Sequence, residues 1–366
     1  MKISTNFTLV AIIILLTGFS IDSYCQRTIT NDVFTKYQKA KKDFEKFEEE
    51  HGNFLQTKNT KVHYLTWGNP MDLPIVWVHG SFTNAYEIKD LAEWFVDAGF
   101  YLIAIDYYGH GLTPIPDHEV SLYHVADDIM EILEHENIEK AVVGGWSRGG
   151  YIASAFYDSY PESVLGLILE DGGTVAANTH YQGIGEDKLK KLVDELFSER
   201  VEYEKFDSEL AAYSAYRDST DQSPQFELLA WITQDKDGSW SIGSGIEELF
   251  HMSSPSQFLQ NIQRPTQVPL FAKSMAMMEP TIIYRNLRVP MLILDPVDDN
   301  DLFPFERQNK KLREMHPNLI QHRIYKNTGH NIHYQRPDAF IKDVLWFLEK
   351  IKLNLFKPSA LSKIAN

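Results

Sequence analysis

Short hydrophobic runs recur along this chain and are separated by helical patterns. Five runs are typical of parallel strands buried on both faces of a sheet. They are "PIVWVHG" (74–80), "YLIAID" (101–106), "KAVVGG" (140–145), "VLGLILEDGG" (164–173) and "VPMLILDP" (289–296). Polar alternation in "KVHYLTW" (61–67) predicts an early antiparallel strand, and "HRIYKN" (322–327) is the expected last strand.

The segments between these runs carry helical periodicity. One such helix follows Ser121, which is a suitable N-cap, and the closing helix is expected to begin at Pro337. Alternating strands and helices predict an α/β fold with a mostly parallel sheet covered by helices on both faces. Near the N-terminus, residues 31–51 also show helical spacing of aromatic residues, with Gly52 at the end. We interpret this helix as packing on the main domain rather than as binding a partner.

Residues 175–286 interrupt the alternation, because they contain helical stretches but no buried-strand run. Such a long insertion is expected to fold as a cap, with one hairpin that turns at Asp237-Gly238. We therefore divide the chain into a signal peptide (1–25), a helical extension (26–53), the first part of the core (54–174), the cap (175–286), the second part of the core (287–352) and a C-terminal tail (353–366).

The first residues indicate export. An apolar run from Leu9 to Leu16 follows Lys2 and is too short to span a bilayer, as in a secretory signal peptide. Ser23 and Cys25 suit cleavage before Gln26, which predicts a periplasmic or extracellular protein without a membrane span in its mature chain. An uncleaved anchor and a lipidated Cys25 are the alternatives. Cys25 is the only cysteine, so a mature chain would have no disulfide and no cysteine metal site.

Composition narrows the class of partner. The 366 residues are 43% hydrophobic and 13% aromatic, which is enough for a large core and excludes global disorder. The net charge of −16 argues against a nucleic-acid partner, whose phosphates would be repelled. We therefore expect a small-molecule substrate as the partner. The sequence does not predict the oligomeric state.

A glycine-rich stretch after a predicted strand holds the first candidate for chemistry. Residues 145–149 read Gly-Trp-Ser-Arg-Gly and match G-x-S-x-G between a buried strand and a helix. Glycines on both sides allow Ser147 to occupy a sharp turn, and the helix N-terminus beginning at Arg148 would stabilise a developing negative charge. A phosphate loop would need Lys-Ser or Lys-Thr after the glycines, which is absent, and a plain turn is the remaining alternative.

A serine nucleophile needs a base held by an acid. His330 lies on the loop after the last predicted strand, whereas we interpret His333 as structural or pocket-lining. Asp298, Asp299 and Asp301 follow the strand 289–296, and one of them is expected to bind His330. A calcium site or a solvated loop would be the alternative for this acidic cluster.

The order serine, aspartate, histidine along the chain is typical of one family of hydrolases. From about residue 55 to 350 the chain resembles the α/β-hydrolase superfamily, in its branch with a lid between strands six and seven. The resemblance depends on "WVHGSF", "DYYGHG", "GGWSRGG", "LILDPVDDNDLFP" and "TGHNIHYQRPDAF", which occur in the expected order. It implies Ser147 as nucleophile, His330 as base, and the backbone N–H groups of Ser81 and Arg148 as the oxyanion hole, with Phe82 in place of Ser81 if the loop is shifted by one.

The acid loop and Arg148 depart from the family pattern. Pro296 stands where relatives have glycine, which selects Asp299 as the acid, but Pro304 comes one residue late and keeps Asp301 as an alternative. The side chain of Arg148 could reach a substrate carboxylate, although we interpret it as a helix-surface arginine paired with an acid. His79 and His110 are expected to brace loops.

These residues predict a serine hydrolase that needs no metal or organic cofactor and acts on carboxylic esters through an acyl-enzyme. A proline iminopeptidase-like activity is the second possibility, with Glu247 and Glu248 of the cap as candidates for holding an amine. Hydrolysis of a carbon–carbon bond is the third. A hydrolase-like protein that only binds its ligand belongs to a different class and stays open.

Overall fold

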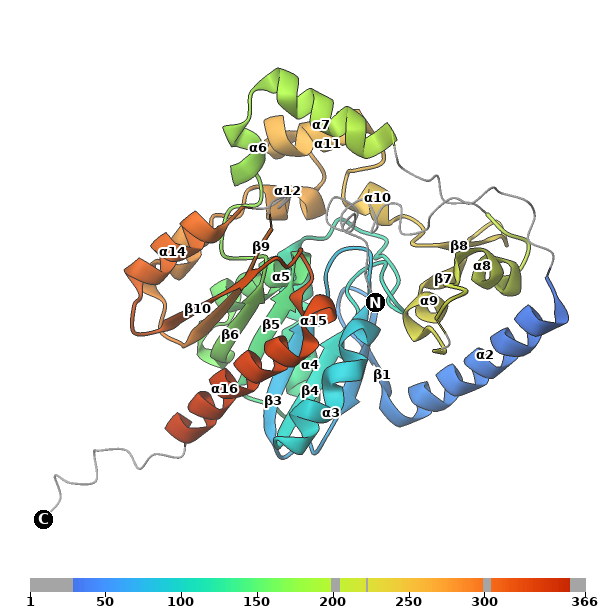
Figure 1. The fold of residues 1–366 in the computed structure, drawn as a ribbon, viewed down its shortest axis with the longest axis horizontal. Coiled ribbons are helices and arrows are strands. Elements are labelled where there is room, and N and C mark those ends of the chain that lie inside the picture. Colours follow the sequence, from blue (N-terminus) through green and yellow to red (C-terminus); the bar gives the residue numbers. More distant parts are fainter. Residues whose placement is uncertain (1–28, 199–204, 222, 299–303, 356–366) are drawn as a thin grey trace, which may run out of the picture.

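The structure, a computed structural model, describes residues 29–198, 205–221, 223–298 and 304–355. Within these ranges an eight-stranded sheet has the order β1-β2-β4-β3-β5-β6-β9-β10 (Figure 1). Its strands are β1 (Gly52–Gln56), β2 (Lys61–Trp67), β3 (Leu73–Val78), β4 (Phe100–Ile105), β5 (Ala141–Trp146), β6 (Val164–Glu170), β9 (Met291–Val297) and β10 (Ile320–Lys326). Within this eight-stranded sheet only β1 with β2 and β2 with β4 pair antiparallel, so the predicted α/β fold with a mostly parallel sheet is confirmed.

Helices cover both faces of the sheet. Helices α4 (Leu122–His135) and α5 (Arg148–Ser159) pack together on one face, while α3 (Lys89–Asp97) and α16 (Pro337–Leu355) lie on the other (Figure 1). Ser121 caps α4, since its hydroxyl accepts from the backbone N–H of His124, and α16 begins at Pro337 as predicted. A large apolar core on each face fixes the sheet, whose carboxyl edge carries the candidate site.

The segment between β6 and β9 folds over this edge (Figure 1). Its helices are α6 (Thr179–Gly183), α7 (Glu186–Ser198), α8 (Glu209–Tyr216), α9 (Phe226–Trp231), α10 (Ile246–Leu249), α11 (Pro255–Gln263), α12 (Leu270–Ala276) and α13 (Pro280–Ile283). The predicted hairpin is confirmed as β7 (Ile232–Gln234) and β8 (Trp240–Ile242), with Gly238 in its turn at φ +86°. Helices α8 and α9 share the core of α3 and α16, whereas α7 and α11 form a small cluster of their own.

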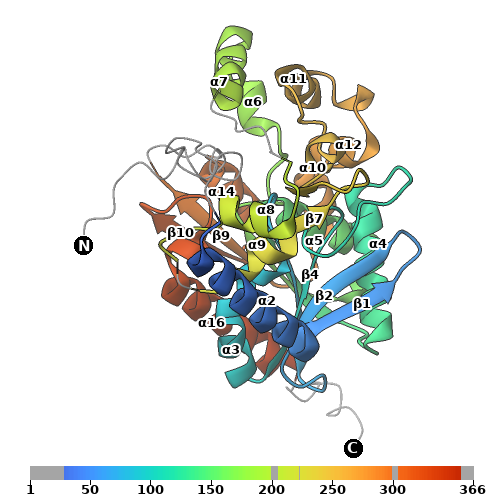
Figure 2. The ribbon, with the colours of Figure 1, turned by 90° about the vertical axis from the view of Figure 1, so that its right-hand side faces the viewer.

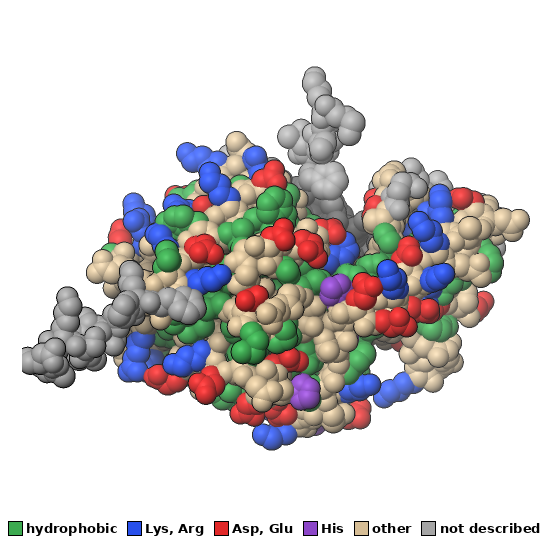
Figure 3. Space-filling view, turned by 90° about the horizontal axis from the view of Figure 1, so that it is seen from below, with side chains coloured by type: hydrophobic (Ala, Val, Ile, Leu, Met, Phe, Trp, Pro, Cys, Tyr) green, Lys and Arg blue, Asp and Glu red, His purple; other side chains and the backbone are tan. Residues whose placement is uncertain are grey.

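Two terminal predictions fall outside the described residues. The signal peptide (1–25), including Cys25, is one, and most of the C-terminal tail is the other, since α16 continues to Leu355. Among the described residues, none of the helices combines the length and the apolar character that crossing a bilayer requires. On the face seen in Figure 3, acidic and basic side chains are interspersed.

Helix α2 (Asn31–His51) forms as predicted and contacts α8 and α9 as well as β1 and β2 (Figure 2). It packs through buried residues such as Phe44 against Tyr86 and Phe226. Because α2 and its neighbours cover β2, positions 62–65 of that strand are all buried instead of alternating with exposed ones. The N-terminal helix is therefore part of the core.

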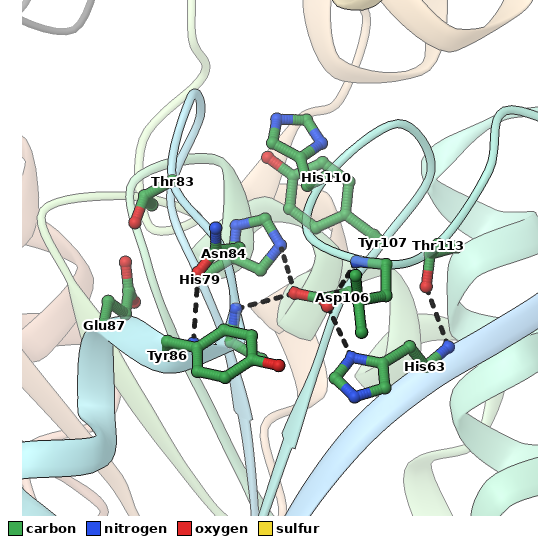
Figure 4. A network of polar contacts seen from close by, with 12 residues as sticks. His63, His79, Thr83, Asn84, Tyr86, Glu87, Asp106, Tyr107, His110 and Thr113 are labelled. Carbon is green, nitrogen blue, oxygen red and sulfur yellow. Dashed lines mark hydrogen bonds and ion pairs between the residues drawn. The ribbon is translucent and has the colours of Figure 1, made fainter. Parts of the chain in front are cut away.

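A buried polar network joins β2 to the loop that follows β3 (Figure 4), and Glu48 of α2 extends it. Asp106 accepts hydrogen bonds from His63 Nδ1 at 2.6 Å and from the backbone N–H of Ala85 at 2.7 Å. Glu48 of α2 faces the other side of His63, with its Oε2 3.1 Å from Nε2, and also accepts from the Tyr86 hydroxyl. Both imidazole nitrogens thus face carboxylates, an arrangement that suits an imidazolium.

Charge explains why this network is stable despite its burial. Burial alone would lower the pKa of His63, but the hydrogen bonds to Asp106 and Glu48 outweigh it and raise the pKa to about 9. His63 is therefore a buried cation at neutral pH, held between two acids. Glu48 therefore helps to support the loop after β3, because it binds His63, which binds Asp106, which in turn binds the Ala85 N–H of that loop.

We expect Glu48→Gln to lower the free energy of unfolding by about 2 kcal/mol near neutral pH, because His63 keeps only one carboxylate partner. A raised pKa stabilises the folded state below the unfolded pKa of about 6.5, and this contribution is lost as the pH rises through the folded value. The difference from the wild type should thus shrink between about pH 7 and pH 10 in urea denaturation. The exposed Glu49→Gln is the control, and an equal loss at both pH values would contradict a charge effect.

Candidate active site

Ser147 occupies a strained turn between β5 and α5. Its backbone has φ +52° and ψ −119°, a region that residues with side chains rarely adopt. Gly145 and Gly149 make the turn possible, because a Cβ at Gly149 would overlap the carbonyl oxygens of Val78 and His79, and one at Gly145 would overlap Gly149. The G-x-S-x-G pattern therefore has the steric basis that the sequence predicted.

Strand register brings a carboxylate next to this serine. In the parallel pair β5–β6, Trp146 lies opposite Glu170, so the next residues along the two strands are Ser147 and Asp171. The backbone N–H of Ser147 donates to the Glu170 carbonyl at 2.9 Å. Asp171 also has a positive φ of 44°, which turns the chain sharply at the end of β6.

His330 lies between these two residues on the loop after β10. Its Nε2 is 2.8 Å from Ser147 Oγ, and its Nδ1 is 2.5 Å from Asp171 Oδ2. Trp146 fixes the backbone of this loop, because its indole N–H donates to the His330 carbonyl at 2.7 Å. Three residues from three strand ends thus form one chain of hydrogen bonds.

The described residues do not include the acid predicted from the sequence. Asp299 and the alternative Asp301 lie outside the described residues, so their assignment stays a prediction. The described carboxylate bonded to His330 is Asp171, which sequence analysis did not consider. A signal was present, since "EDGG" follows a buried strand directly and its two glycines permit a sharp turn.

The two backbone N–H groups of the candidate oxyanion hole have no protein acceptor among the described residues. Within the described residues, neither the Ser81 amide nor the Arg148 amide donates to a protein acceptor. The Phe82 amide is engaged, because it donates to His110 Nε2 at 3.3 Å. Of the two loop positions considered, Ser81 is therefore the one whose N–H group is available to a developing oxyanion.

His79 and His110 brace the loops around this position (Figure 4). His79 Nδ1 lies 2.7 Å from the Gly80 carbonyl, and His110 Nδ1 lies 3.0 Å from the Tyr108 carbonyl. Burial lowers the pKa of His79 to about 4 and that of His110 well below its ordinary value, so both rings are neutral at pH 7. A neutral His110 can accept from Phe82, as the geometry requires.

His333 is structural. Its backbone N–H donates to Glu170 Oε1 at 3.0 Å, and its Nδ1 is 2.8 Å from Glu170 Oε2. Burial would lower the pKa of His333, but the Glu170 carboxylate outweighs burial and raises it. Because Glu170 is the last residue of β6, its contact with His333 supports the strand end that carries Asp171.

The interpretation of Arg148 as a surface residue is wrong. Its side chain is 7% exposed, and among the described residues it forms no ion pair with an acid. The described residues also contain no group of three or more His, Asp or Glu side chains arranged to hold a metal ion.

Comparison with known proteins identifies the fold family of the chain. A family model for the alpha/beta hydrolase fold matches residues 74–337. A bifunctional esterase/perhydrolase of Acinetobacter calcoaceticus is 23% identical over 303 residues, which cover 81% of this chain and 99% of that protein. A probable proline iminopeptidase of Leptolyngbya boryana is 30% identical over 110 residues, so the match spans only 30% of this chain and 34% of that protein.

Solved structures give the same fold. E-2-(acetamidomethylene)succinate hydrolase superposes with a TM-score of 0.58 at 17% identity, covering 81% of this chain and 98% of that one. The family match extends from β3 to the start of α16 and includes the serine turn, Asp171 and the His330 loop. The chain therefore belongs to the alpha/beta hydrolase fold family.

Proposed function

We propose that this protein is a serine hydrolase that cleaves carboxylic esters through an acyl-enzyme, with Ser147 as nucleophile, His330 as base and Asp171 as acid. The observation that carries this proposal is the continuous hydrogen bonding from Ser147 Oγ through both nitrogens of His330 to Asp171. The similarity to an esterase/perhydrolase over most of the chain supports the choice of ester substrates.

Each residue of the site has its own role in the proposed ester hydrolysis. Ser147 Oγ attacks the ester carbonyl while His330 Nε2 takes its proton, and Asp171 holds the imidazolium in orientation through Nδ1–H. The N–H groups of Ser81 and Arg148 donate to the oxyanion of the tetrahedral intermediate, and the N-terminus of α5 adds its dipole. His330 then protonates the departing alcohol. Water, deprotonated by the same histidine, releases the acid from Ser147.

The aminopeptidase alternative has less support. Glu248, one of the two proposed amine-binding residues, accepts from the Ser253 hydroxyl at 2.9 Å. The probable proline iminopeptidase of Leptolyngbya boryana matches only 30% of this chain. A panel of esters, prolyl amides and a vinylogous diketone would distinguish the three bond classes, and we expect the esters to have the highest kcat/KM.

Covalent labelling tests the nucleophile. We expect a fluorophosphonate to add once to the wild-type protein and not to Ser147→Ala, because only a serine activated by His330 attacks phosphorus at a useful rate. Intact-mass analysis measures the adduct, and thermal denaturation confirms that the variant is folded. A folded wild-type protein that takes up no label and cleaves none of the panel would favour the ligand-binding class.

A pair of matched variants tests the acid. We expect Asp171→Asn to lower kcat for esters by about 10²–10⁴-fold, because the amide cannot accept the Nδ1–H hydrogen bond and favours the wrong tautomer of His330. Asp299→Asn should lower kcat by less than about tenfold. The reverse order would restore the acid predicted from the sequence and leave Asp171 with a structural role.

A further inference from the structure

Arg148 lies where a guanidinium is costly to keep. It is the first residue of α5, directly after Ser147, and its side chain is 7% exposed. Burying a cation without an acidic partner is unfavourable, because other contacts must replace the hydration that it loses. A side chain retained in such a place needs a compensating interaction.

Protein contacts satisfy only part of this guanidinium. Its Nε donates to Ser81 Oγ at 2.9 Å. The Phe250 ring lies against one face, with its centroid 3.6 Å from Cζ, and the Phe271 centroid is 5.9 Å away. These contacts explain how the side chain is held and oriented. They leave the terminal nitrogens, Nη1 and Nη2, without an acceptor among the described residues.

The electrostatic surroundings are also poor in negative charge. The ionisable groups that interact electrostatically with Arg148 are Tyr107, Tyr151 and His110. Burial lowers the pKa of Arg148 to about 10, and the two tyrosines oppose this only in part. At neutral pH the tyrosines and His110 are uncharged, so the guanidinium is a cation that no described carboxylate neutralises.

The position of Arg148 links it to the reacting carbonyl. Its own N–H group and that of Ser81 are the two available donors for an oxyanion, and its side chain is hydrogen-bonded to Ser81. A group bound to the guanidinium would therefore lie within one arginine side chain of the bond that is cleaved. The planar fork of the guanidinium matches a carboxylate, which can accept two parallel hydrogen bonds.

We propose that the Arg148 side chain binds a carboxylate of the substrate close to the scissile ester, so that the protein prefers anionic esters to neutral ones. This inference rests on the proposed ester hydrolysis. A purely structural role, in which Arg148 only joins the core to Phe250 and Phe271 of the cap segment, is the competing explanation, and the experiments below separate the two.

Two matched pairs of esters test the preference. In mono-para-nitrophenyl succinate the carboxylate is in the acyl part, and its methyl ester is the neutral partner. In para-acetoxybenzoate the carboxylate is in the leaving group, with methyl para-acetoxybenzoate as partner. We expect kcat/KM of the wild type to favour the anion by about tenfold or more in at least one pair. Comparable values within both pairs would overturn the proposal.

Variants of Arg148 connect this preference to the guanidinium. Arg148→Met should reduce the ratio of anionic to neutral kcat/KM by about 10–100-fold, mainly through KM, and Arg148→Lys should give an intermediate loss. Arg288→Met is the control, because that arginine is exposed and pairs with Glu162 on the surface. If Arg148→Met lowers both members of each pair equally, the structural explanation is correct.

A binding measurement tests carboxylate recognition by Arg148 without depending on catalytic turnover. Ser147→Ala should bind para-acetamidobenzoate or succinanilate more tightly than the corresponding primary amide, and adding Arg148→Met should abolish this difference in calorimetry. If Arg148→Met does not fold, competitive inhibition of the wild type by the same carboxylates decides, and no inhibition contradicts the proposal. Fluorophosphonate labelling of the wild-type preparation used for the kinetics separates the two failures: a labelled wild-type protein without anion preference refutes only the role of Arg148.

Discussion

The parallel pairing of β5 with β6 determines where the reacting groups lie. Because Trp146 is opposite Glu170, the two chains leave the sheet side by side, and both turn sharply at their next residue. Ser147 and Asp171 hold left-handed backbone conformations there, which cost free energy and persist only when the surroundings enforce them. The Ser147 N–H bond to the Glu170 carbonyl and the close fit of Gly149 beneath the carbonyls of β3 supply that enforcement.

Buried polar pairs farther from Ser147 also support the strand ends and loops around it. His333 on Glu170 supports the end of β6, and His63 between Glu48 and Asp106 supports the loop after β3. His63 is a buried cation between two carboxylates, where removing one partner is costly, and the Glu170 carboxylate raises the pKa of His333. The N-terminal helix thus contributes to the site through Glu48, although it lies outside the region matched by the family.

Local patterns in the sequence were sufficient to predict the sheet, the serine turn and His330 as a candidate residue. Strands, helix caps and glycine-flanked turns depend mainly on neighbouring residues in the chain. The acid could not be decided in this way. Carboxylates follow both β6 and β9, both come between the serine and the histidine in order, and only the register of the strands shows that Asp171 lies beside Ser147. The burial of Arg148 was equally hidden, since Phe250 and Phe271, which cover it, come far later in the chain.

The loop after β3 is held from several directions at once. Asp106 binds the Ala85 N–H, His110 binds the Phe82 N–H, and the Tyr107 hydroxyl donates to the Gly80 carbonyl at 2.9 Å. Donors fixed in this way stabilise an oxyanion without reorganising during the reaction. The Arg148 side chain links the two proposed oxyanion donors through its hydrogen bond to Ser81 Oγ, and it also contacts Phe250 of the cap segment. One side chain thus joins the loop after β3, helix α5 and the cap segment, so the position of Phe250 is linked through Arg148 to Ser81 and to the start of α5.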